Sequence, residues 1–281
     1  MVSKSDVIIS AMRNLGDLVV DGVPASLTGS SLDHLSLIFP LSQQMQGWSA
    51  YIYSGAGAGQ ERIIGSFNAT NHRVVFPQVF ASIPSVNSNF VISKKFAWSD
   101  YKNAVDRFMG IARSKHLVER VATTALVATQ YEYPVPSGME YISTLRLVPT
   151  NGTDYAGNDI VDRIFEIPPR FWRTERNVGG SYLVSIDSRK LNLGNVDAYI
   201  IRINGQGKPD VLGTDNATVM PALEEYLIAG ASAQMCGLLQ GSDKRLDPRF
   251  YMYRNMVKGE GTSVGLEEYI FSYARGKRVG S

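Results

Sequence analysis

The stretch Trp48-Ser49-Ala50-Tyr51-Ile52-Tyr53, followed by Ser54-Gly55-Ala56-Gly57-Ala58-Gly59, decides how the first third of the chain folds. Its first half is aromatic and β-branched, which favours a β-strand, and its glycine run ends that strand. Further strands are predicted at Gln60–Phe67, His72–Phe76 and Asn89–Ser93. Short strands separated by tight turns and one long loop are typical of a small barrel-like β module.

Helical spacing of apolar residues flanks this module and returns near the C-terminus. The predicted helices are Ser5–Leu18, a segment from Ser99 that fades near Val118, Thr218–Leu239 and Pro248–Lys258. In each of them, apolar residues three or four positions apart fall on one face. Between the module and the first helix, residues 21–31 are expected to form a turn-rich connection.

A second β block lies between Val121 and Leu212, and its apolar runs are punctuated by prolines. Because no helical segment separates these runs, they predict an antiparallel sandwich and argue against a parallel βαβ sheet. The expected strands are Ala122–Ala128, Gln130–Tyr133, Tyr141–Val148, Asp162–Glu166, Tyr182–Ile186 and Asp197–Ile203.

The fold class expected is therefore α+β. It comprises a small N-terminal β-barrel-like module, an antiparallel β-sandwich, and a helical portion made of the central and C-terminal helices. The expected segments are an N-terminal helix (1–20), the small β module (21–96), a connecting helix (97–120), the β-sandwich (121–213), C-terminal helices (214–258) and a C-terminal arm (259–281).

Composition narrows the function classes. Of 281 residues, 44% are hydrophobic and 19% charged, which indicates a folded chain with a real core. A net charge of +2 gives no support to an extended nucleic-acid surface, although it leaves a small basic patch open. The single cysteine, Cys236, excludes a disulfide within one chain and is expected to pack in the core. No apolar run is long enough to span a membrane, and Met1–Asp6 lacks a secretory leader, so folding in a cytoplasm is expected.

The motifs associated with catalysis or cofactors are weak. Gly55, Gly57 and Gly59 have the wrong spacing for a dinucleotide loop, and no lysine follows them, so a turn between two strands is the better interpretation. His34, His72 and His116 have no second ligand at metal-binding spacing, and no G-x-S-x-G elbow occurs. We therefore expect no catalytic, cofactor-binding or metal-binding residues, no cofactor and no enzymatic activity.

The C-terminal arm carries aromatic residues just before a short basic cluster. Such a cluster can contact nucleic acid or an acidic partner, or it can be a solvated terminus, whereas aromatic residues on a terminal extension usually pack against something. The candidate interface residues are Tyr269, Phe271, Tyr273, Arg275, Lys277 and Arg278.

Three passages together resemble the head-to-tail connector (adaptor or neck) proteins of tailed bacteriophages. The first runs from Gly47 through the Gly59-Gln60-Glu61-Arg62-Ile63 motif to Ile92, and the helix from Trp98 is the second. The third is Tyr131–Ile142, which resembles the start of that family's β-sandwich; Arg170–Arg173 and the Pro221–Leu239 helix follow in the expected order. Together these passages cover most of residues 1–240.

This resemblance implies a virion structural protein, made in the bacterial host cytoplasm. Its copies would form a homo-oligomeric ring between portal and tail, with DNA passing through the lumen; twelve-fold rings are common in that family. The implied partners are the portal protein and tail or further neck proteins, and no membrane is involved. A closed ring of this kind requires two different patches on each subunit to meet, and the C-terminal arm is a candidate for one of them.

Two other interpretations remain open. A tail or baseplate component could use the same β modules. A receptor- or carbohydrate-binding module would instead need an exposed aromatic platform, for which Trp172 and Tyr182 are the candidates, although packing in the core or a turn is favoured for both.

Overall fold

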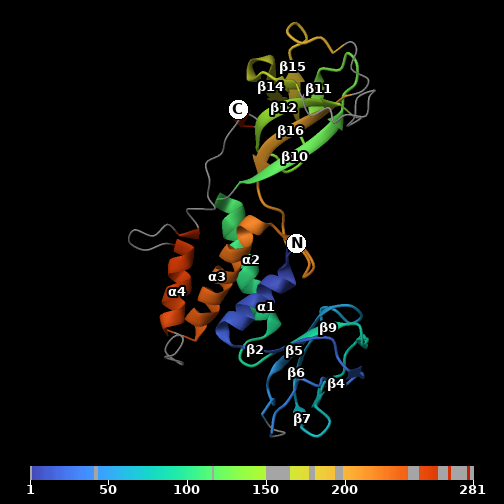
Figure 1. Cartoon of the computed structure of the whole chain (residues 1–281), viewed down its shortest axis with the longest axis vertical. Helices are drawn as coiled ribbons and strands as arrows, with labels where there is room; N and C mark the ends of the chain where they lie inside the picture. The colour runs from blue at the N-terminus through green and yellow to red at the C-terminus, as the bar shows by residue number, and fades with distance from the viewer. Residues whose placement is uncertain are drawn as a thin grey trace, which may run out of the picture. The chain divides into compact units, whose positions relative to one another are not determined.

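The computed structural model describes residues 2–40, 44–115, 117–149, 165–176, 181–193, 199–239, 247–258, 265–266 and 277–278. The chain divides into two compact units (Figure 1). Unit 1 contains residues 1–112 and 211–270, and unit 2 contains residues 113–210 and 271–281. Helices and antiparallel sheets both contribute, so the expected α+β class is confirmed.

The helices of unit 1 have buried apolar faces, as their spacing predicted. They are α1 (Lys4–Leu15), α2 (Trp98–Lys115), α3 (Pro221–Leu238) and α4 (Asp247–Lys258). Ser3 and Asp6 form a capping box at the start of α1, and Gly16 ends the helix in the left-handed conformation (φ 67°). Predicted helix Thr218–Leu239 begins later than expected, because Thr218–Val219 (β17) pairs with Val2–Ser3 (β1).

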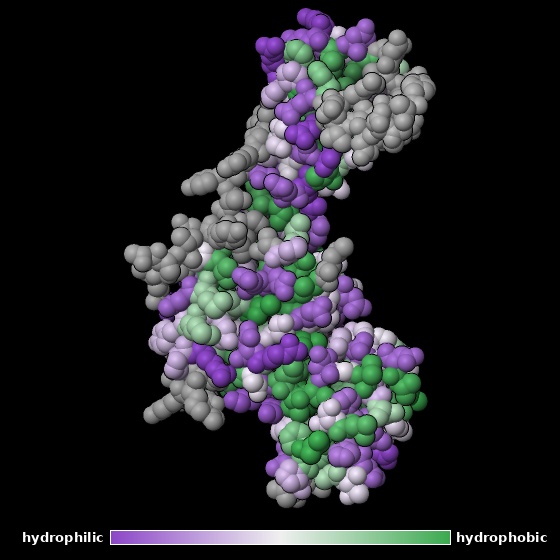
Figure 2. Space-filling view, in the orientation of Figure 1, coloured by the Kyte–Doolittle hydropathy of each residue, from purple (hydrophilic) through white to green (hydrophobic). Residues whose placement is uncertain are grey.

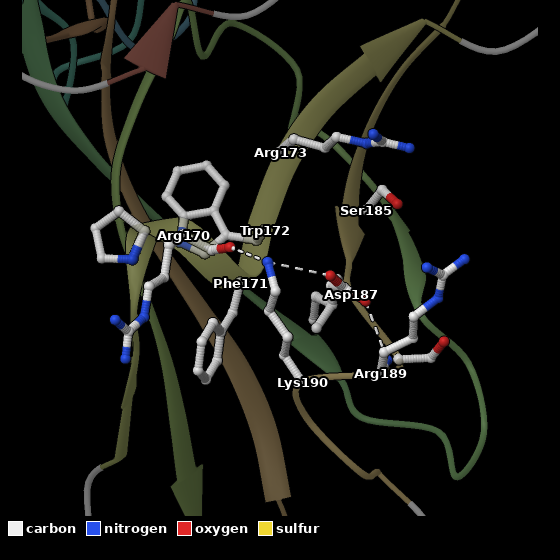
Figure 3. A pocket seen from close by; sticks show the side chains of 11 residues that line it. Arg170, Phe171, Trp172, Arg173, Ser185, Asp187, Arg189 and Lys190 are labelled. Atoms are coloured by element: carbon white, nitrogen blue, oxygen red, sulfur yellow. Dashed lines mark hydrogen bonds and ion pairs between the residues drawn. The ribbon is translucent and has the colours of Figure 1, made fainter.

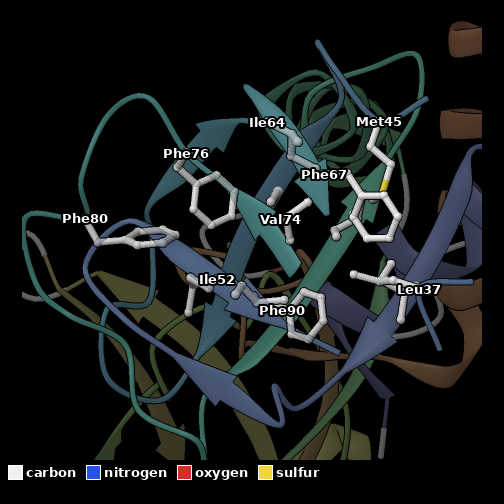
Figure 4. Packing of buried hydrophobic residues seen from close by; sticks show 13 residues of the cluster. Leu37, Met45, Ile52, Ile64, Phe67, Val74, Phe76, Phe80 and Phe90 are labelled. Atoms are coloured by element: carbon white, nitrogen blue, oxygen red, sulfur yellow. The ribbon is translucent and has the colours of Figure 1, made fainter. Parts of the chain in front are cut away.

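The β module consists of two four-stranded sheets. One has the order β2 (Leu18–Gly22), β9 (Asn89–Ser93), β5 (Ser49–Ser54) and β6 (Glu61–Ile63). The other has the order β3 (Ser26–Leu27), β4 (Ser31–Asp33), β8 (Arg73–Val75) and β7 (Ser66–Asn68). Both sheets contribute side chains, among them Ile52, Phe67, Val74 and Phe90, to one apolar core (Figure 4).

Two predictions for this module were wrong. Gln60–Phe67 is not one strand, because the chain leaves the first sheet after Ile64, whose N–H donates to the Trp48 carbonyl (2.8 Å), and enters the second at Gly65, which donates to Val75 (2.9 Å). Residues 21–31, expected to be a turn-rich connection, contain the end of β2, all of β3 and the start of β4.

A buried carboxylate joins the end of α1 to the segment before α2. Asp17 is 1% exposed. Its Oδ1 accepts from the backbone N–H groups of Lys94 (2.9 Å) and Lys95 (2.7 Å), and its Oδ2 accepts from the Phe96 N–H (3.3 Å) and the Tyr101 hydroxyl (2.9 Å). One side chain therefore fixes where α2 begins relative to α1.

Unit 2 is a β-sandwich, as predicted. Its larger sheet has the order β10 (Val118–Ala125), β16 (Tyr199–Gly207), β12 (Tyr141–Pro149) and β13 (Phe165–Ile167), with β18 (Lys277–Arg278) also on β12. The smaller sheet has the order β11 (Glu132–Pro134), β15 (Tyr182–Ile186) and β14 (Trp172–Arg176), and the 3-10 turn η2 (Pro169–Phe171) precedes β14. Leu145, Trp172 and Ile203 belong to the core that the two sheets share.

Candidate functional site

Aliphatic side chains stand exposed on the β8–β9 loop (residues 76–88) and beside it. Val79, Ile83 and Val86 are 61%, 63% and 54% exposed, and Ile63, at the end of β6, is 55% exposed. We call these four residues the apolar loop surface. Figure 2 shows hydrophobic residues at the surface of the β module.

Two polar side chains hold the β8–β9 loop in place: Arg62 in β6 and Gln60 just before that strand. The Arg62 guanidinium donates through Nε (3.1 Å) and Nη2 (3.0 Å) to the Val79 carbonyl and lies 5.3 Å from the centre of the Phe80 ring. Gln60 accepts from the Ala81 N–H at Oε1 (2.7 Å) and donates from Nε2 to the Ser82 carbonyl (2.7 Å). The exposed aliphatic side chains therefore sit on a fixed backbone.

The glycine run packs against the same loop. Gly55 and Gly57 have left-handed φ angles of 83° and 76°; a Cβ on Gly55 would lie 2.8 Å from the Ser88 Cα, and one on Gly57 would lie 2.9 Å from the Ser82 carbonyl oxygen. The run joins β5 to β6, which pair antiparallel. The interpretation as a glycine-rich turn between two strands is confirmed.

A second loop, residues 34–40, also exposes aliphatic side chains and is also held through a backbone carbonyl. Leu37 is fully buried, and the His72 ring meets its carbonyl through Nδ1 at 2.8 Å, while Leu35 and Ile38 are 74% and 76% exposed. His34 packs edge-on against a buried ring, and burial lowers its pKa. Two of the three histidines thus serve the structure of this module, and His116 lies outside the described residues.

A pocket of about 510 Å³ opens on the smaller sheet of unit 2 (Figure 3). It lies where η2 leads into β14 and where β15 runs into the turn Asp187–Lys190, because the register pairs Trp172 with Ile186. Four cationic side chains line it against a single carboxylate. They are Arg170, Arg173, Arg189 and Lys190, with Asp187 as the acid.

The turn in this pocket is fixed by Asp187. Its Oδ1 accepts from the Arg189 N–H (3.0 Å) and its Oδ2 lies 3.3 Å from the Lys190 Nζ, which also donates to the Arg170 carbonyl (3.2 Å). The Arg189 amide, and then Lys190, hold the pKa of the Asp187 carboxyl below its usual value. The carboxylate therefore holds the backbone of the turn and the Lys190 ammonium.

The aromatic residues of this region do not form an exposed platform. Trp172 is 4% exposed and belongs to the sandwich core, as was favoured from the sequence. Tyr182 is 37% exposed, and the Arg176 guanidinium lies 6.0 Å from its ring centre. A sugar-stacking surface of these two residues is not formed.

The structure places only part of the candidate interface. Lys277 and Arg278 form β18, which pairs antiparallel with Ile142 and Tyr141 at the start of β12. Tyr269, Phe271, Tyr273 and Arg275 lie outside the described residues. Neither the apolar loop surface nor the cationic pocket was identified from the sequence as a site, although the Arg170–Arg173 passage contributes to the pocket.

The remaining chemistry of the described residues is limited. Cys236 is buried in α3, as expected, and burial raises the pKa of its thiol. Across the described ranges, no three His, Cys, Asp or Glu side chains are grouped so that they could hold a metal ion. None of the helices described is both long and apolar enough to cross a membrane. No protein-family model matches this chain, and no curated protein matches it either.

Proposed function

We propose that this protein is a virion structural protein, a ring-forming subunit of the phage neck that joins portal and head to the tail around the DNA channel. The observation that carries the proposal is the apolar loop surface on its fixed backbone. Exposed aliphatic surface is unfavourable in water by about 25 cal/mol per Å² and, where it gathers, is typical of a surface that a partner protein covers.

The fixed backbone matters as much as the apolar character. A loop already held by Arg62 and Gln60 loses little conformational entropy when a partner docks, so more of the burial energy appears as affinity. A mobile loop with the same side chains would lose part of that energy in ordering.

The partner of this surface is a second copy of the chain. A closed ring requires a heterologous contact in which two different patches meet. The β module offers two loops that expose aliphatic residues, one with Val79 and Ile83 and one with Leu35 and Ile38. The C-terminal arm is a further candidate for such a contact. The portal and tail positions rest on the family resemblance.

The test is the mass of the purified protein by light scattering, alone and mixed with the portal protein from the same source. A monomer that becomes a defined ring on the portal supports the proposal. A stable monomer that ignores the portal would refute the neck position and favour a tail or baseplate component.

Two variants assign the contact. Replacing Val79 and Ile83 together by serine should abolish the ring while leaving the monomer folded. The matched control is Val211→Ser, which changes an aliphatic residue that is 63% exposed outside the β module. Removal of residues 259–281 tests the arm separately; unchanged ring assembly and portal binding would exclude the arm from the interface.

A further inference from the structure

We infer that the cationic pocket on the smaller sheet of unit 2 binds the phosphodiester backbone of nucleic acid. Its lining has an excess of three positive charges, from four cations and one carboxylate. The whole chain has a net charge of only +2. Positive charge therefore exceeds negative charge along this lining, and the pocket is a candidate for the small basic patch that the composition left open.

Two of the cations are available to a ligand. Within the described residues, neither Arg170 nor Arg189 forms a salt bridge, and Figure 3 shows their side chains extending on either side of Lys190. Lys190 is held between Asp187 and the Arg170 carbonyl, and Arg173 pairs with Glu175, two residues along the same strand. The guanidinium group presents a planar fork of donors that matches phosphate oxygens.

The arrangement fits a polymer of phosphates better than one small anion. The cations stand around an open hollow and do not converge on one point (Figure 3). A nucleic-acid strand carries a fixed charge about every 3.4 Å along its axis, so one strand can meet several of these cations at once. The hydroxyls of Ser185 and Ser188 line the same hollow and add donors without adding charge.

Among the residues described around it, the pocket also lacks the exposed aromatic or aliphatic residues on which a bound protein segment is normally anchored. Interfaces between proteins have central anchors that are aromatic or aliphatic. Here Trp172 and Ile186 are 4% and 2% exposed, and the Phe171 ring has Arg170 at 5.2 Å and Lys190 at 6.0 Å from its centre. The described lining is therefore mostly polar and cationic and has no deep apolar recess for an anchor side chain, which favours a phosphate backbone over a protein segment.

This inference rests on unit 2 alone and does not depend on ring assembly. The test is fluorescence anisotropy of a labelled 20-base-pair duplex with the full chain over a series of NaCl concentrations. For phosphate contacts by the two unpaired arginines, the logarithm of the association constant should fall against the logarithm of salt with a slope of about −2. The double variant Arg170→Gln/Arg189→Gln should lower the affinity by about tenfold or more and reduce that slope by about 2.

The matched control is Arg146→Gln, which removes a cation from the same sandwich where it is paired with Glu166 (3.3 Å). It should leave both affinity and slope unchanged, and thermal melts of all variants should coincide. The inference is overturned if the duplex does not bind at low salt, or if the double variant binds it as the wild type does. It is also overturned if a poly-glutamate peptide of equal charge displaces the duplex at equal concentration, since the pocket would then be specific for acidic protein segments.

Discussion

Replacing Asp17 by asparagine tests whether one buried carboxylate fixes the junction between α1 and α2. The substitution keeps the size of the side chain and removes its charge. In the native protein two donors point at each carboxylate oxygen. The amide of asparagine can accept at only one of the two positions and presents an NH₂ group at the other.

The magnitude follows from these four contacts. If the remaining oxygen faces Lys94 and Lys95, the NH₂ group faces the Phe96 N–H, which can only donate, and the Tyr101 hydroxyl, which can turn and accept. One buried donor is then left unsatisfied at a cost of about 1–3 kcal/mol. Loss of the charge weakens the other bonds by about 0.5–1 kcal/mol in total, because bonds to charged groups contribute more than neutral ones. We expect Asp17→Asn to destabilise unit 1 by about 1.5–4 kcal/mol.

Urea unfolding followed by tryptophan fluorescence measures this cost. Trp98 reports on the site, since it begins α2 two residues after Phe96, whose N–H donates to Asp17, and its ring is buried. The matched control is Asp21→Asn, which affects a single exposed bond from the Tyr53 hydroxyl (2.8 Å) and should cost less than about 1 kcal/mol. An Asp17→Asn protein that unfolds within about 0.5 kcal/mol of wild type would refute the reasoning, because no buried donor could then have lost its acceptor.

Three further outcomes are expected. Gly57→Ala should lower the free energy of unfolding in urea by about 2–4 kcal/mol, because it adds a contact of 2.9 Å with the Ser82 oxygen to the strain of a left-handed φ. Gly59→Ala has φ 90° but nothing within 4 Å of its Cβ, so it should lower that free energy by only about 1–2 kcal/mol. Equal losses for the two variants would mean that the contact with Ser82 is relieved. Burial lowers the pKa of His34 below 6.5, so the unfolded chain takes up a proton first and the free energy of unfolding should fall as the pH drops below 6.5. His34→Gln should make the free energy of unfolding less dependent on pH between about pH 7 and 5. An unchanged pH dependence would assign it to other groups. Arg62→Ala should speed hydrogen exchange throughout the β8–β9 loop while leaving exchange in β9 unchanged, and unaltered exchange in the loop would show that Gln60 alone holds it.

Local patterns predicted most of the elements, because periodicity and turn residues act over a few positions. Asn89–Ser93 and Tyr182–Ile186 have the bounds expected from their apolar and β-branched runs. The prediction failed at Gln60–Phe67, where a single run of residues serves two sheets. Ile64 and Phe67 are both buried although they lie three positions apart, so the two-residue alternation breaks between them, where the chain crosses. Strands of two or three residues, such as β3, are too short to carry any period.

The sites were harder to predict for the same physical reason. Asp17 binds groups 77 to 84 positions away along the chain, and no local pattern marks a carboxylate that will be buried. The cationic pocket needs Arg170 and Arg173 beside Arg189 and Lys190, and only the pairing of β14 with β15 brings them together. A signal was present, since two cationic pairs flank one predicted strand, but its meaning depends on a register that the sequence does not fix.

One of the segments on which the resemblance was based, Gln60-Glu61-Arg62, has its own structural explanation. In Gln60-Glu61-Arg62, the first and third side chains hold the β8–β9 loop. The Glu61 carboxylate accepts from the N–H of Trp98 at the start of α2 (2.6 Å) and from the Ser49 hydroxyl (2.6 Å). The three side chains of the motif thus connect β6 to β5, to the β8–β9 loop and to the start of α2, and none of them needs a ligand for this role. Under the proposed function, partner specificity would lie in the exposed residues of the loop that the motif holds, such as Val79 and Ile83.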